Sequence, residues 1–376
     1  MIRYKILLCL FLAYFTLLGF SYKDEITPAY LKDLRLQYEK DPTLWPKPTI
    51  DSGIVFRELG AIEFPYRAKD SIEVAKIALG KTLFFDPRLS GSNQISCSSC
   101  HEPELNWTDG RKLSIGNDHL MGIRNSPSIQ NLGQAKSLMW DGRHQTLEDQ
   151  IADALTNPTE MNGDLEEATN KINQIKGYQP LFKKAFNKKK LSNFELRQSI
   201  AAFVKSIKSR PTRFDNFILG RKRALSDQQV LGLHLFRTKA RCINCHNGPL
   251  FTDGDFHNLG MSNYGRKGED LGRYKATRAS TDVGKFKTPS LRDAMRTFPW
   301  FHNGRFNEIE SLLNMYVAGM PQPRPTKEQV NDPLFPKASP HLKKLDINLE
   351  ERAAIVAFLQ AITSSPFEFE RPVLPK

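Results

Sequence analysis

The chain has 376 residues, of which 40% are hydrophobic and 25% are charged. This composition excludes a largely disordered chain, and the length suits two domains with buried cores. The formal net charge is +13 at pH 7, which is common among nucleic-acid-binding proteins. Basic clusters are more often solvated helix faces or docking sites for acidic proteins, so charge alone assigns no function.

The first 21 residues read as a secretory signal peptide. Arg3 and Lys5 precede an apolar run over residues 6–20, and small residues follow at a suitable cleavage position. The alternative is an uncleaved membrane anchor. If the signal is cleaved, Cys9 leaves with it and the chain has no stable membrane insertion. Because exported proteins rarely meet nucleic acid, we expect no nucleic-acid partner.

Helical patterns dominate the chain after an N-terminal arm. Residues 22–70 are rich in Pro, Asp and Lys and predict an arm that lies on a domain. Residues 349–362 have an amphipathic pattern typical of a closing helix, whereas residues 254–282 predict a loop. Capping sequences predict three further helices, which begin after Thr146, Ser192 and Ser226.

Alternating strand patterns are scarce, which favours an all-α fold. A boundary near residues 210–224 would leave one cysteine pair in each half. We therefore predict two mainly helical domains, residues 71–222 and 223–376, the second carrying a C-terminal tail.

One unusual phrase occurs twice: ISCSSCHEPELNWTDG from Ile95, and CINCHNGPLFTDG from Cys242. In each copy a histidine follows two cysteines that stand three positions apart, and the phrase ends in an aromatic residue and Thr-Asp-Gly. One helical turn would place both sulfurs on one side, with the imidazole across the same cleft. That arrangement suits two thioether bonds to a porphyrin and one axial bond to its iron.

The four mature cysteines could instead form two disulfides or one zinc site. Zinc sites usually form compact modules, whereas these pairs lie far apart in the sequence. Neither alternative explains the histidine after both pairs, when the chain has only eight. We therefore predict two covalent c-type haems: haem 1 on Cys97, Cys100 and His101, and haem 2 on Cys242, Cys245 and His246.

The surrounding sequence resembles a known family. LGKTLFFDPRLSGSNQISCSSCH, RNSPSIQN, MWDGRHQTLEDQ, NPTEM, CHNGPLFTDGDFHNLG and DVGKFKTPSLRDAMRTFPWFHNGRF follow in order within residues 71–363. Together they are similar to the bacterial di-haem cytochrome c peroxidases, which include the MauG branch whose members oxidise a protein substrate. The resemblance implies an all-α fold of two cytochrome c-like domains that face each other across a calcium site.

The same resemblance implies partners and a location. Hydrogen peroxide would be reduced at haem 1, and electrons would enter at haem 2 from a small c-type cytochrome or cupredoxin. The protein would lie in the periplasm. The oligomeric state stays open, with a homodimer as one option.

Three residues match catalytic positions of the family. Glu160 in NPTEM matches the glutamate that shuttles a proton between the peroxide oxygens. Gln150 matches the distal glutamine, and Trp140 matches the tryptophan between the haems, which can relay electrons. Without the resemblance they would read as a loop glutamate, a helix-surface amide and a core indole.

The resemblance also implies a calcium site. Asn125 would bind through its side chain, and Thr297 and Pro299 through their carbonyls. Oxygen ligands of this kind suit a hard cation.

Two positions depart from the family pattern. Asn117 stands where peroxidases that need reductive activation have a distal histidine, and His119 follows two residues later. We therefore expect haem 1 to be open in the oxidised protein. Asp153 and Ala154 replace the usual Gly-Pro after the glutamine, so the distal wall is expected to differ.

The sixth ligand of haem 2 is predicted to be Tyr316. By position it matches the methionine of well-known peroxidases and the tyrosine of the MauG branch, and it shares an apolar helix stripe with Leu312 and Leu313. Met315 and Met320 are the alternatives. A thioether ligand raises the haem potential, whereas an oxygen donor lowers it.

We therefore predict an exported di-haem oxidoreductase of the cytochrome c peroxidase type, which reduces hydrogen peroxide to water. A MauG-like oxidase that uses peroxide to oxidise a protein or small-molecule partner is the first alternative. A plain di-haem electron carrier is the second, and Glu160 and Gln150 argue against it.

Overall fold

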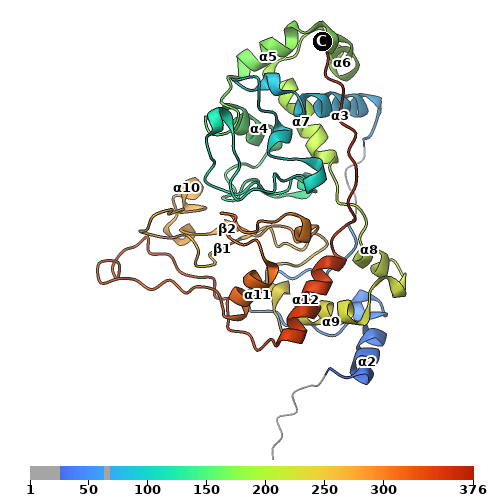
Figure 1. Ribbon diagram of the computed structural model, residues 1–376, viewed down its shortest axis with the longest axis vertical. Coiled ribbons are helices and arrows are strands. Elements are labelled where there is room, and N and C mark those ends of the chain that lie inside the picture. Colours follow the sequence, from blue (N-terminus) through green and yellow to red (C-terminus); the bar gives the residue numbers. More distant parts are fainter. Residues whose placement is uncertain (1–25, 63–67) are drawn as a thin grey trace, which may run out of the picture.

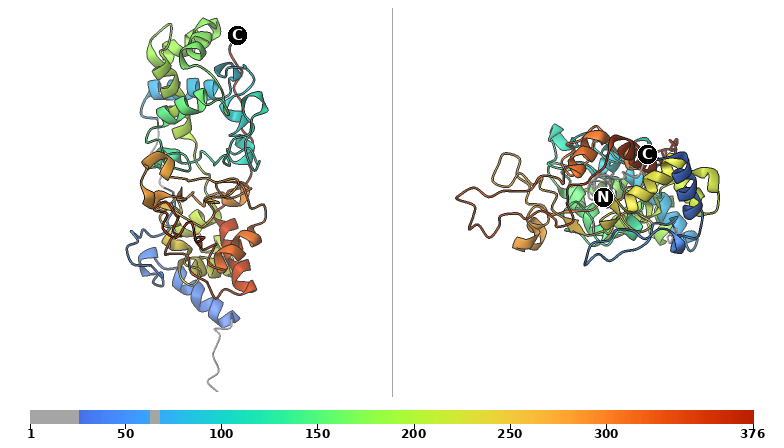
Figure 2. Two further views of the ribbon diagram at one scale, coloured as in Figure 1. Left: turned by 90° about the vertical axis from the view of Figure 1, so that its left-hand side faces the viewer. Right: turned by 90° about the horizontal axis from the view of Figure 1, so that it is seen from below.

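The computed structural model describes residues 26–62 and 68–376. The predicted signal peptide, with Cys9, lies outside the described residues. Two helical halves are stacked along the long axis of the molecule (Figure 1). Figure 2 shows that long loops of the second half, coloured orange, project to one side of this stack. No helix in the described ranges is long and apolar enough to cross a membrane.

The first half is built on one helix crossing. At that crossing Gly80 approaches its partner helix so closely that a Cβ would lie 1.8 Å from the Ser199 carbonyl oxygen. The buried side chains of this half, such as Leu83 and Phe203, form one core. Its helices are α3 (Ser71–Phe84), α4 (Leu147–Thr156), α5 (Leu165–Gln174), α6 (Gln179–Phe186) and α7 (Asn193–Ser206), and α3 crosses α7.

The second half repeats the plan around a separate core. Here α9 precedes the second cysteine pair, as α3 precedes the first, and it crosses α12. A Cβ on Gly232 would lie 2.0 Å from the Ala354 carbonyl oxygen. The helices are α8 (Arg213–Ile218), α9 (Asp227–Arg237), α10 (Tyr274–Thr277), α11 (Ile309–Val317) and α12 (Leu349–Ala361).

The predicted helix starts are confirmed. Thr146, Ser192 and Ser226 each accept a hydrogen bond from the backbone N–H three positions on, and so cap α4, α7 and α9. The closing helix is α12, which ends one residue before the predicted end.

The fold is mostly helical, as predicted, and the described residues also contain one small sheet. Strands β1 (Phe256–His257) and β2 (Phe286–Lys287) pair antiparallel, with Phe256 opposite Lys287. The predicted loop over residues 254–282 is therefore wrong in two places, since it contains β1 and α10. β1 pairs with a strand outside that window, and Arg273, the residue before α10, donates its backbone N–H to the carbonyl of Lys285. Contacts distant in sequence, which local patterns do not encode, form these short elements.

Single 3-10 turns join the longer elements. Two of them carry the cysteine pairs, so the expected helical turn at each pair is present as a 3-10 turn. They are η1 (Pro42–Leu44), η2 (Pro87–Leu89), η3 (Cys97–Ser99), η4 (Pro103–Leu105), η5 (Asn117–His119), η6 (Leu132–Gln134), η7 (Lys176–Tyr178), η8 (Lys222–Ala224), η9 (Cys242–Asn244), η10 (Ser280–Asp282) and η11 (Ala294–Arg296).

The two ends of the chain lie on opposite halves. Helix α2 (Pro28–Tyr38) of the arm packs on the second half, where Leu34 and Tyr38 join the core. After α12 the chain runs back along the first half and ends beside α6 (Figure 1). Phe369 and Leu374 of this tail contact the first core. Each half is thus covered by a segment from the other end of the chain.

Candidate active site

One continuous cavity of about 1190 Å³ lies between the halves and is lined by both CxxCH motifs. This volume exceeds the usual range for one small-molecule pocket. The first half contributes the wall that bears His101, Gln150 and Glu160, and the second contributes the wall that bears His246 and Tyr316. The cavity therefore brings together the residues predicted at both haems, except Cys97, which does not line it.

The two histidines have matching surroundings. His101 Nδ1 lies 3.0 Å from the carbonyl oxygen of Trp107, and His246 Nδ1 lies 3.0 Å from that of Phe251. A carbonyl only accepts, so each Nδ1 carries the proton and each Nε2 keeps a free lone pair. Burial lowers the pKa of both imidazoles, which keeps them neutral. Neutral imidazole with an oriented Nδ1–H is the form that binds a metal.

This geometry explains why both motifs end in an aromatic residue and Thr-Asp-Gly. Trp107 and Phe251 both adopt positive φ, 62° and 53°. The turn directs their carbonyls back at the histidine, while the large rings pack into the core of their own half. The aromatic residues are thus hydrogen-bond partners of the histidines, a role that the sequence analysis did not assign.

Neither alternative for the cysteines is present in the described residues. All four mature cysteines are free there, without a disulfide. The one cluster with metal-ligand geometry in this part of the chain is Cys245, Asp253 and His257, and it contains a single cysteine. Free cysteines, neutral histidines and a large shared cavity all fit two covalently attached haems.

Glu160 lies on the first-half wall beside Gln150. Burial, followed by the charge of Asp153, raises the pKa of the Glu160 carboxyl. Asn157 donates to Glu160 Oε1 at 3.0 Å and orients it. The loop that contains Gly116 packs closely against the backbone of Glu160: a Cβ on Gly116 would lie 2.6 Å from the Glu160 carbonyl oxygen. The carboxyl is therefore held in place and its protonated form is favoured.

Asp153, one of the departures from the family pattern, belongs to a charged group at this wall. It accepts hydrogen bonds from Arg143 Nη2 at 2.8 Å and from His144 Nε2 at 2.9 Å. These partners lower the pKa of the Asp153 carboxyl, although burial opposes them. Asp153 therefore stays ionised and acts electrostatically on Glu160.

The distal loop offers no histidine to the cavity. Asn117 is buried, and its backbone N–H donates to the Glu160 carbonyl at 2.7 Å. His119 is exposed. Neither lines the cavity, which agrees with the expectation of an open haem 1 but does not test it.

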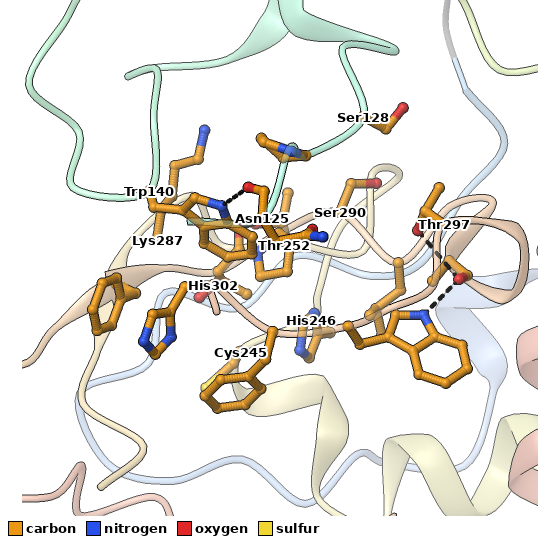
Figure 3. Close-up of a pocket in the computed structure, with 18 of the residues that line it drawn as sticks. Asn125, Ser128, Trp140, Cys245, His246, Thr252, Lys287, Ser290, Thr297 and His302 are labelled. Atoms are coloured by element: carbon orange, nitrogen blue, oxygen red, sulfur yellow. Dashed lines mark hydrogen bonds between the residues drawn. The ribbon is translucent and has the colours of Figure 1, made fainter. Parts of the chain in front are cut away.

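Trp140 stands where the halves meet (Figure 3). Its Nε1 donates to the backbone carbonyl of Asn125 at 2.8 Å. Beside it, Arg124 bridges Asp141 of the first half and Asp270 of the second, at 2.6 and 2.7 Å. These ion pairs fix the two halves around the indole.

The predicted calcium ligands lie on the same cavity. Asn125, Thr297 and Pro299 all line it, the first from one half and the others from the other. Figure 3 shows Asn125 and Thr297 on either side of Ser290. The Asn125 side chain donates to the Arg111 carbonyl at 2.8 Å through Nδ2, so its Oδ1 is the atom that could bind a cation.

Tyr316 on α11 lines the cavity, whereas Met315 and Met320 do not. Burial raises the pKa of the Tyr316 phenol, and Cys245 and Cys242 lie near enough to add to the rise. Met320 packs with Met261 and Phe306 in a small cluster, against which Tyr316 and Met315 also pack. Of the three candidate ligands, Tyr316 is therefore the one that lines the cavity of the second haem-attachment site.

Comparison with known proteins gives consistent matches. A family model described as di-haem cytochrome c peroxidase matches residues 74–223. The methylamine utilization protein MauG of Methylorubrum extorquens is 33% identical over 314 residues, 83% of this chain and 84% of that protein. Cytochrome c551 peroxidase of Nitrosomonas europaea is 32% identical over 298 residues, 79% of this chain and 82% of that protein.

The fold also matches solved structures. The crystal structure of a MauG-like protein associated with microbial copper homeostasis aligns with a TM-score of 0.70 and 27% identity, over 84% of this chain and 96% of that one.

Proposed function

Since this chain belongs to the di-haem cytochrome c peroxidase family and is an oxidoreductase, we propose that it reduces hydrogen peroxide to water at haem 1. Two electrons would arrive singly from a small redox protein through haem 2. The observation that carries this proposal is the position of Glu160, a half-buried carboxyl on the cavity wall of the haem 1 half.

Glu160 and Gln150 have different roles at this wall: Glu160 transfers a proton and Gln150 orients the peroxide. Haem 1, when bound, supplies an iron that can accept electrons and pass them to peroxide. Glu160 takes a proton from one peroxide oxygen and returns it to the other, which leaves as water. The raised pKa of Glu160 favours this transfer, because it makes the carboxylate a better proton acceptor from the peroxide in the first place. The amide of Gln150 orients the peroxide by hydrogen bonding.

Trp140 lies on the route between the two haem-binding walls. The Arg124 bridge to Asp141 and Asp270 keeps the halves in register around it. A fixed indole between the two sites can relay single electrons from haem 2 to haem 1.

The direct test is to add hydrogen peroxide to the purified ferric protein and follow the haem spectrum. We expect a stoichiometric change without prior reduction. A panel of reduced small cytochromes and cupredoxins should then be oxidised, with two electrons consumed per peroxide. A haem spectrum that does not respond would contradict the proposal and indicate a plain electron carrier.

A MauG-like oxidase is the second candidate, and the position of Tyr316 favours it. A phenol at the haem 2 wall would supply an oxygen donor where a thioether would raise the potential. In this candidate, peroxide would oxidise a protein or small-molecule partner instead of a reduced cytochrome. Oxidised side chains in an incubated periplasmic extract, detected by mass spectrometry, together with no turnover of the cytochrome panel, would select it.

We also propose a periplasmic protein after cleavage of residues 1–21, and a calcium ion at Asn125, Thr297 and Pro299. The basic and apolar pattern of the N-terminus supports the first. The approach of all three residues to one cavity supports the second. N-terminal sequencing of the exported protein tests cleavage, and metal analysis before and after chelation tests calcium.

A further inference from the structure

Lys287 joins the two halves at the cavity. Its backbone N–H donates to the Trp140 carbonyl at 2.8 Å, and its Nζ donates to the Ser137 carbonyl at 2.9 Å. Both acceptors belong to the first half, whereas Lys287 ends β2 of the second half. Figure 3 shows Lys287 beside Trp140. The ammonium group therefore lies at the junction, in the wall of the haem-binding cavity.

This ammonium has no carboxylate partner among the described residues. Two nearby cations do have one: Lys285 pairs with Asp282 at 3.1 Å, and Arg124 pairs with two aspartates. Burial is the one cause of a pKa lowered to about 8 for Lys287. Lys287 is partly buried, and a cation withdrawn from water without a counter-charge is costly; the Ser137 carbonyl supplies only a partial charge.

The cavity fits two haems, and each haem carries two propionate carboxylates. We propose that Lys287 binds a haem propionate at the junction of the two halves. The inference rests on haem in the cavity, as the proposed function does, but not on any reaction with peroxide. It makes Lys287 a cofactor-binding residue that also fixes the backbone of Trp140 next to the same carboxylate.

The bound pair would affect the haem electrostatically. A cation near the iron disfavours the ferric state, which carries one more positive charge than the ferrous state. Lys287→Gln should therefore favour the oxidised form by about tenfold, equal to a midpoint potential about 59 mV lower for a one-electron couple. Both haems should stay attached, because the thioether sulfurs are untouched.

The experiment is a redox titration of both haems in the purified holoprotein, without peroxide. Lys285→Gln is the matched control, since it removes an ammonium two residues away that is already paired. Lys287→Arg should retain wild-type potentials, because the charge is kept.

A lower potential for at least one haem in Lys287→Gln, but not in Lys285→Gln or Lys287→Arg, supports the proposal. Potentials in Lys287→Gln that equal those of Lys285→Gln overturn it. Because the titration needs no turnover, this failure is distinct from failure of the proposed peroxidase function, which the peroxide experiment reports.

Discussion

Glu160 is the side chain whose replacement tests the peroxide chemistry directly. Glu160→Gln keeps the size of the side chain and removes its proton exchange. We expect both haems to remain attached and the reaction with peroxide to slow by about a hundred- to ten-thousand-fold, the usual range for acid–base catalysis. Stopped-flow mixing with peroxide measures this.

The matched control is Glu148→Gln on α4, a carboxylate that faces Lys205 at 3.6 Å and does not line the cavity. The pH profile adds a second check. The pKa of Glu160 is raised, and the carboxylate is the form that accepts a proton. The wild-type rate should therefore fall as pH drops through that raised pKa, and Glu160→Gln should lose this dependence. Wild-type kinetics in Glu160→Gln would remove the residue from the mechanism.

The ligand of haem 2 can be read from spectra of variants. If Tyr316 binds, the oxidised protein should lack the weak near-infrared band typical of histidine–methionine haems. Tyr316→Phe should then alter the haem 2 spectrum and raise its potential, because an oxygen donor is lost. Met320→Ala should leave both unchanged. The reverse pattern, with the band present and lost only in Met320→Ala, contradicts the assignment.

At the residue scale, the sequence alone was enough to predict the functional side chains that belong to short motifs. The two CxxCH phrases identified four cysteines and two histidines because covalent haem chemistry demands adjacent residues. The Trp107 and Phe251 carbonyls could have been suspected from the repeated aromatic-Thr-Asp-Gly ending. Lys287 gave no such signal, since its unpaired state exists only when β2 meets the loop of the other half.

The helix crossings are the elements most sensitive to a small change. A Cβ at Gly232 would lie 2.0 Å from the Ala354 carbonyl oxygen, so α9 and α12 must separate in Gly232→Ala. We expect the free energy of unfolding to fall by about 1–3 kcal/mol, as for other overpacked cores. Gly60→Ala is the control, because its Cβ would meet the nearest atom at 3.7 Å. Equal thermal stability of the two variants would refute the close crossing.

The C-terminal tail contacts the residue whose carbonyl holds His101. The Phe369 ring stacks on Phe85 at 5.6 Å and meets Trp107 edge-on at 5.1 Å. The carbonyl of Trp107 in turn holds His101. We expect Phe369→Ala to lower stability by about 1–3 kcal/mol, less than for a fully buried phenylalanine, and to change the haem 1 spectrum.

Phe367→Ala is the control, since Phe367 does not pack on the first core. Thermal unfolding and the spectrum of the oxidised protein measure both effects. If Phe369→Ala lowers the stability but leaves the haem 1 spectrum unchanged, the tail only stabilises the first half and does not influence His101.

Elements with local signals were predictable and those built by distant contacts were not. Helices α4, α7 and α9 begin at capping residues that the sequence displays. Strand β1 and helix α10 have only two and four residues; β1 pairs with residues 286–287, and Arg273, just before α10, bonds to Lys285. No local periodicity distinguishes such segments from a loop.

At the scale of the molecule, two halves with the same plan share one cavity. The N-terminal arm packs on the second half, and the C-terminal tail packs on the first half. The sequence predicted two halves from the repeated motif. It could not show that the arm packs on the second half, or that the tail packs on the first. An amphipathic pattern shows that a segment has an apolar face, but not which other segment that face contacts. Unfolding of the two halves should consequently be coupled.

Without residues 1–21, which carry Arg3 and Lys5, the net charge is 13 − 2 = +11, and this charge should select the electron donor. The basic protein attracts acidic donors electrostatically, and salt screens this attraction. Association with an acidic donor should therefore be faster at low ionic strength. We expect the second-order rate constant for an acidic small cytochrome to fall steeply as NaCl rises, and that for a basic one to be low and rise slightly. The reaction of the ferric protein with peroxide serves as the control, because peroxide is uncharged and its rate should not respond to salt. Donor rates that ignore ionic strength would mean that the basic residues are solvated surface, and that the donor docks through an apolar contact instead.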